Sequence, residues 1–177
     1  QIQIFLQQIP FYNPMSNVLS FIDMLTSGSA IVIRHAERYD ICKPSDYWTC
    51  GLTDNGMLQA RDFGLKISEH FDSYRLFFSP VARCRETAEN IMSSLISRDS
   101  EVTAIGPERQ LSVLSYMHVN EIEGFREADR FGKGFIRAWF EGKVDPAIYK
   151  QLGETRDEHL AYLRDKFSTN GARHLDI

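Results

Sequence analysis

A short apolar segment that ends abruptly in basic residues constrains the fold more than any other feature of the sequence. Residues 30–33 (Ala-Ile-Val-Ile) have the composition of a buried β-strand, and Arg34, His35 and Arg38 follow it. In α/β proteins, buried parallel strands deliver the residues after them to the sheet edge where ligands bind. Guanidinium groups match phosphate oxygens, and an imidazole nitrogen can attack phosphorus. The segment therefore predicts a phosphate site, although an ordinary solvated strand end explains it about as well when it is taken alone.

Strand-like and helix-like segments alternate along the rest of the chain. Further short strands are predicted at residues 75–78, 101–105 and 174–177. Capped or amphipathic helical patterns cover residues 53–71, 80–96 and 157–167. This alternation predicts the α/β class, as a three-layer α/β/α sandwich with a mostly parallel central sheet.

The chain divides into two parts of unequal size. Residues 1–28 are irregular apart from a short predicted helix at 17–25, and we interpret them as an N-terminal extension. Residues 29–177 are predicted to form a single α/β domain, because no repeat or low-complexity tract interrupts the pattern. Within this domain, the aromatic-rich residues 107–142 predict helices that cap one end of the sheet.

Composition excludes several classes of protein. A net charge of −4 over 177 residues argues against a nucleic-acid or membrane-surface binder, and the lack of a long apolar run argues against a membrane span. No metal-ligand spacing is present, so neither a metal nor a cofactor is expected. Cys42 and Cys50 could form a disulfide if the protein is exported; reduced thiols in the cytoplasm are the preferred alternative. Oligomeric state is left open.

A second strand end carries another arginine. The strand predicted at residues 75–78 is followed by Ser79, Pro80 and Arg83. Because parallel strands end at the same edge of a sheet, Arg83 is expected to join Arg34 and Arg38 beside His35. Three guanidinium groups suit phosphoryl transfer, whose transition state spreads negative charge over the phosphoryl oxygens. They would also keep His35 neutral and nucleophilic.

Three motifs in order give this pattern a family resemblance. They are Arg34-His35-x-x-Arg38, Leu52-Thr53-x-x-Gly56-x-x-Gln59-Ala60 and Ser79-Pro80-x-x-Arg83-Cys84-x-x-Thr87-Ala88. On these motifs, which span about residues 30–96, the sequence resembles the histidine phosphatase superfamily of phosphoglycerate mutases and histidine acid phosphatases. The resemblance implies a phosphoglycerate mutase-like fold.

The resemblance also implies roles for individual residues. His35 is expected to be the nucleophile that becomes phosphorylated, and Arg34, Arg38 and Arg83 are expected to bind the phosphoryl group. Arg85 is interpreted as a surface charge, and Glu37 as a solvated or packing residue.

Two parts of the family's site have no match in the sequence. The family places a second histidine after a later strand; here that position would fall beyond Ile177, and His174 precedes the strand. We therefore expect the chain to be incomplete at its C-terminus. The mutase-like glutamate acid is also absent, since Val113 occupies its position and Glu121 is more simply a loop carboxylate. An acid-phosphatase-like acid would also lie beyond Ile177, and the form of the first motif leans towards that branch.

The favoured prediction is a metal-independent phosphatase that acts on small phosphorylated substrates through phospho-His35. The alternatives are a non-catalytic module that binds inorganic phosphate or a partner, and a mutase-like phosphotransferase. Substrate specificity is expected from residues 39–50 and from residues 116–142, which could form a lid. Aromatic residues there, such as Tyr47 and Trp139, could stack a substrate, but buried packing is their commoner fate.

Overall fold

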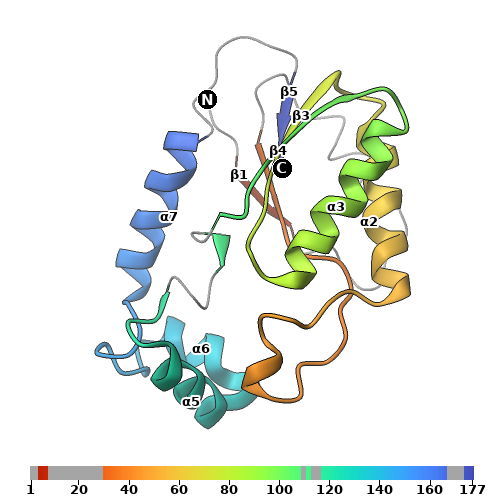
Figure 1. Ribbon diagram of the computed structural model, residues 1–177. Helices are drawn as coiled ribbons and strands as arrows, with labels where there is room; N and C mark the ends of the chain where they lie inside the picture. The colour runs from red at the N-terminus through yellow and green to blue at the C-terminus, as the bar shows by residue number, and fades with distance from the viewer. Residues whose placement is uncertain (1–3, 8–29, 109–110, 113–116, 167–173) are drawn as a thin grey trace. The chain divides into compact units, whose positions relative to one another are not determined.

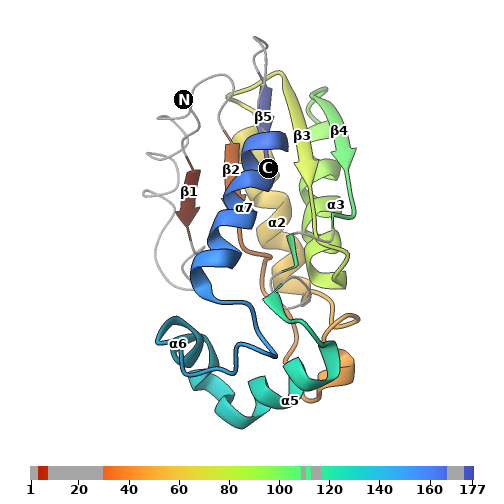
Figure 2. The ribbon, with the colours of Figure 1, turned by 90° about the vertical axis from the view of Figure 1, so that its left-hand side faces the viewer.

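Five parallel strands form one sheet in the computed structural model, which describes residues 4–7, 30–108, 111–112, 117–166 and 174–177 (Figures 1 and 2). The strands are β1 (Ile4–Gln7), β2 (Ala30–Ile33), β3 (Ser73–Phe77), β4 (Glu101–Ile105) and β5 (His174–Asp176). Their spatial order is β1-β2-β5-β3-β4, and every pairing is parallel. All five strands therefore end at the same edge, where the residues that follow β2 and β3 are found.

Two helices cover one face of this sheet (Figures 1 and 2). Helix α2 (Asp54–Ile67) begins after Thr53, whose hydroxyl accepts a hydrogen bond from the Gly56 backbone N–H, as an N-cap does. Helix α3 (Ala82–Ile96) follows β3 and packs closely along α2. Apolar side chains from both helices and from the strands form the core beneath them, including Ile31, Leu76, Ile67, Ile91 and Leu95.

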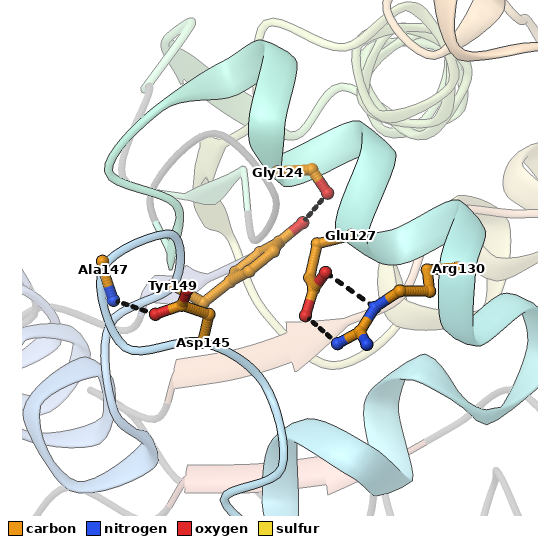
Figure 3. A network of polar contacts seen from close by, with 6 residues as sticks. All are labelled: Gly124, Glu127, Arg130, Asp145, Ala147 and Tyr149. Carbon is orange, nitrogen blue, oxygen red and sulfur yellow. Dashed lines mark hydrogen bonds and ion pairs between the residues drawn. The ribbon is translucent and has the colours of Figure 1, made fainter.

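A helical unit, Arg109–Lys166, separates from the unit that holds the sheet, Gln1–Glu108 with Phe167–Ile177. Its helices are α5 (Glu121–Phe131), the 3-10 turn η3 (Gly132–Gly134), α6 (Phe135–Phe140) and α7 (Leu152–Lys166). Its own small core contains Met117, Phe135, Trp139 and Tyr149. The Tyr149 hydroxyl donates to the Gly124 carbonyl at 2.6 Å, and Glu127 pairs with Arg130 within α5 (Figure 3).

The structure confirms the predicted α/β class and its parallel sheet, and it corrects several boundaries. Helix α2 ends at Ile67, four residues before the predicted end, because the chain turns there towards β3. Pro80 precedes α3 and is not in its first turn. Helix α7 begins at Leu152, five residues earlier than expected. No helix among the described residues is long and apolar enough to cross a membrane.

The N-terminal part gives a different result from the prediction. Residues 4–7 form β1, which pairs with β2 from Ile4 opposite Ala30 to Gln7 opposite Ile33. The sequence alone did not indicate this strand. The predicted helix at 17–25 lies outside the described residues. A second helical layer of the sandwich, and the capping of the sheet by residues 107–142, stay predictions.

Candidate active site

His35 stands two residues after β2, at the carboxyl edge of the sheet, and is partly buried. Its Nδ1 lies 2.8 Å from the carbonyl oxygen of Ala36. A carbonyl oxygen only accepts, so this bond holds the proton on Nδ1 and leaves the lone pair on Nε2. The pKa of His35 is lowered to about 4, mainly by burial. The hydrogen bond to Ala36 raises the pKa, and the charges of Arg83, Arg34 and Arg38 lower it. The imidazole is therefore neutral at neutral pH.

Three arginines surround this histidine closely enough to affect its pKa. Arg34 is exposed, and Arg38 is partly buried with Nη1 donating to the Tyr39 carbonyl at 2.6 Å. Arg83, in the first turn of α3, is only 6% exposed. The structure thus brings together the four residues that the motifs singled out. Their catalytic roles stay predictions.

Arg83 is held by the loop that follows the first motif. Its Nη1 donates to the Tyr47 carbonyl at 2.6 Å, and its guanidinium lies 4.6 Å from the centre of the Tyr47 ring. The Nε of Arg83 is buried and has no hydrogen-bond partner among the described residues. Within the same part of the chain, none of Arg34, Arg38 and Arg83 forms an ion pair with a carboxylate. This leaves three cations that an anionic ligand could neutralise.

One aromatic ring of this loop, that of Tyr47, is packed inside the protein and is not available to a ligand. Tyr47 is buried on Arg83, and the Trp48 carbonyl accepts a hydrogen bond from Ala82 N at 3.0 Å. In the other unit, Trp139 is also buried, with its indole N–H donating to the Lys150 carbonyl at 2.8 Å. For Tyr47 and Trp139, buried packing was therefore the correct alternative to stacking on a substrate. Cys42 and Cys50 are free thiols in this structure.

Several polar residues around the first motif were missed as contributors to the site. The backbone N–H of Ala36 donates to the Thr87 hydroxyl at 3.1 Å, and that hydroxyl donates to the Arg83 carbonyl at 2.7 Å. Glu37 is bonded to the N-terminal turns of α2. Gln59, whose Oε1 accepts from the Glu37 backbone N–H, and Thr87 are both part of the family motifs. Their place in these motifs is the sequence signal that could have identified them. Glu37 has no comparable signal in the sequence.

Other candidate residues lie elsewhere in the fold. Arg85 is exposed and pairs with Glu89 at 3.7 Å, as expected of a surface charge. His174 is the first residue of β5, at the amino end of the strand and away from the carboxyl edge. Glu121 is the first residue of α5, in the helical unit, and Val113 lies outside the described residues. No group of three or more described His, Cys, Asp or Glu residues is arranged to hold a metal ion.

Comparison with known proteins gives a match to one family. The family model "histidine phosphatase superfamily (branch 1)" matches residues 31–165. Two solved structures that resemble it are provisionally named phosphohistidine phosphatases SixA, from Nakamurella multipartitia (14% identity, TM-score 0.37) and Agrobacterium tumefaciens (12% identity, TM-score 0.32). The matches cover 83% and 79% of this chain; they cover 55% of the first protein and 83% of the second. No curated protein sequence matches the chain.

Proposed function

Because the chain belongs to the histidine phosphatase superfamily, we propose that it is a phosphomonoester phosphatase that works through a phosphohistidine intermediate on His35. The observation that carries the proposal is a buried arginine, Arg83, which has no carboxylate partner among the described residues and stands beside a neutral histidine. A buried cation is costly unless it is paired. A phosphoryl group would supply the missing charge and an electrophile for the imidazole.

The first step is attack by the free Nε2 of His35 on phosphorus. The new N–P bond forms as the P–O bond to the leaving alcohol breaks, and the bond electrons stay on the leaving oxygen. Arg34, Arg38 and Arg83 offset the charge on the phosphoryl oxygens. Water then attacks the phosphorus, which releases inorganic phosphate and returns the electron pair to Nε2. The Ala36 carbonyl keeps the Nδ1 proton in place throughout.

The leaving oxygen needs a proton unless it departs as a stable anion. His35 is the proposed nucleophile and the other three proposed residues are arginines, whose guanidinium groups stay protonated, so none of the four is the general acid. Substrates with a good leaving group, such as p-nitrophenyl phosphate, should therefore react much faster with this chain than alkyl phosphates of the same charge.

The test is hydrolysis of p-nitrophenyl phosphate in the presence of excess chelator. We expect turnover by the wild-type chain and none by His35→Ala, because the nucleophile is lost while a strand-end side chain contributes little to the core. Arg85→Ala, on the exposed side of α3, is the matched control and should keep full activity. Turnover that persists in His35→Ala, or that disappears with the chelator, would contradict the proposal.

A second candidate function is phosphate binding without catalysis. It is favoured because, in the part of the chain that the structure describes, the charges that shift the pKa of His35 come from arginines and none comes from a carboxylate. Phosphate or vanadate would then raise the melting temperature of the chain, while p-nitrophenyl phosphate would not be hydrolysed. The mutase alternative requires a glutamate acid from the region of residues 113–121, and it stays a prediction.

A further inference from the structure

The side chains of the first motif depend on their own backbone for their positions. Among the described residues, His35 is hydrogen-bonded through Nδ1 to the carbonyl of the next residue, Ala36. Arg38 is likewise bonded to the carbonyl of the next residue, Tyr39. No hydrogen bond from a side chain of the described helices reaches the His35 imidazole or the Arg38 guanidinium. Whatever fixes the backbone between these two residues therefore fixes both of them.

Glu37 occupies that intervening position, and its polar groups are bonded to α2 and its cap. The carboxylate accepts from the Thr53 hydroxyl at 2.7 Å and from the Asn55 side-chain amide at 2.9 Å. The backbone carbonyl of Glu37 accepts from Thr53 N at 3.1 Å, and its backbone N–H donates to Gln59 Oε1 at 3.1 Å. The Thr53 hydroxyl also donates to the Glu37 carbonyl at 3.5 Å. Two bonds to the side chain and three to the backbone thus join this one residue to the cap and the first two turns of α2.

The contact between Glu37 and α2 leaves no spare room. A Cβ atom added to Gly56 would lie 2.0 Å from the Glu37 carbonyl oxygen and 2.9 Å from its carbonyl carbon. Both are backbone atoms, so no side-chain rotation can relieve the clash. The helix start is therefore seated directly against the backbone between His35 and Arg38.

We propose that Glu37 is a positioning residue, which anchors the backbone of the first motif to α2 and so sets the placement of His35 and Arg38 for an anionic ligand. The inference rests on the proposed function and deepens it, because the ligand is the phosphoryl group. Both carboxylate oxygens of Glu37 are hydrogen-bonded to α2 and its cap, so we assign the side chain a role in the protein scaffold and none in the reaction itself. Its effect passes through the backbone.

The first test compares Glu37→Ala with Glu37→Gln by calorimetric titration with inorganic phosphate. Glu37→Ala removes both side-chain bonds, and we expect phosphate affinity to fall about tenfold, the effect of losing one hydrogen bond to a charged group. Glu37→Gln keeps an amide oxygen that can accept from Thr53, so it should restore most of the affinity. Wild-type affinity in Glu37→Ala, or equal loss in both variants, would overturn the proposal.

A second pair of variants separates positioning from stability. The added Cβ of Gly56→Ala would clash with the Glu37 backbone. The added Cβ of Gly64→Ala, on the same helix, would lie 2.8 Å from Ile91 O and from Ser94 Cβ, away from the first motif. Both should lower the melting temperature, but only Gly56→Ala should also weaken phosphate binding in folded protein. Equal affinity in the two variants would overturn the positioning role. If Gly56→Ala does not fold, the Glu37 pair decides the question.

A failure of the proposed function would look different. In that case the wild-type chain would itself bind neither phosphate nor vanadate, and the site would have no ligand to position. If the wild-type chain binds and the Glu37 variants bind equally well, the proposed function stands and only the positioning role is wrong.

Discussion

Two arginines of helix α5 and three arginines at the strand ends differ in their ionic partners. In the helical unit, Arg126 and Arg130 of α5 each pair with a glutamate three residues earlier, Glu123 and Glu127 (Figure 3 shows the second pair). In the unit that holds the sheet, Arg34, Arg38 and Arg83 have no carboxylate partner among the described residues. The two arginines of α5 are neutralised within the helix, whereas those at the strand ends have the charge that the proposed phosphoryl ligand would neutralise.

The burial of Arg83 sharpens this contrast. Arg130 can remain hydrated because its side chain is 62% exposed, while Arg83 as a whole is 6% exposed. An unpaired buried charge costs several kcal/mol, as an order of magnitude. The Tyr47 carbonyl and ring offset part of that cost, but Nε stays without a partner. Under the proposed function, a bound phosphate would supply the negative charge that buried Arg83 lacks among the described residues.

The largest effect should come from removing Arg83. We expect Arg83→Ala to weaken phosphate binding by about 1.5–3 kcal/mol, the usual contribution of a charge-assisted hydrogen bond. Arg130→Ala should leave phosphate binding unchanged and lower the unfolding free energy by less than about 1 kcal/mol, since the Arg130 side chain is 62% exposed and water screens its pairing with Glu127. Calorimetric titration and urea unfolding of both variants give the comparison. Equal phosphate affinity in Arg83→Ala and Arg130→Ala would contradict the contrast between the two arginines.

A smaller effect should appear in the pH dependence of stability. In the folded chain the pKa of His35 is about 4, whereas the ordinary pKa of 6.5 applies when the chain is unfolded. Between these values the unfolded state binds more protons, so the stability that neutral His35 contributes is complete above about pH 6.5 and is lost as the pH falls towards 4. Urea unfolding at about pH 7 and about pH 5 should show a steeper loss for wild type than for His35→Asn. Identical losses would contradict the lowered pKa.

Local chemistry decided which parts could be predicted from the sequence. The Thr53 cap and the change from an apolar strand to Arg34 and His35 each depend on a few neighbouring residues. The structure confirms that Thr53 caps α2 and that Arg34 and His35 directly follow the strand β2. The start of α7 was missed because Gly153 and polar neighbours hide the pattern there. Strand β1 was missed because its four residues are ordered by pairing with β2, more than twenty residues away in sequence.

The support of the site was the least predictable part. Glu37 is bonded to Thr53 and Asn55, which follow it by sixteen and eighteen residues. Arg83 is held by Tyr47, thirty-six residues before it. Neither distance corresponds to a helical or strand period, so no pattern links these residues. The contacts of Glu37 with α2, and of Arg83 with the carbonyl and ring of Tyr47, are therefore visible only in the folded chain.

The most direct test of the central claim is to look for the phosphoryl group on His35. The chain would be incubated with a radiolabelled phosphoryl donor of good leaving group, such as acetyl phosphate, and the label located by peptide mapping under alkaline conditions. We predict that the label is on the peptide that contains His35, that it is lost in acid as a phosphoramidate is, and that His35→Ala takes up none. Label on another residue, or equal uptake by His35→Ala, would contradict the assignment of His35 as the nucleophile.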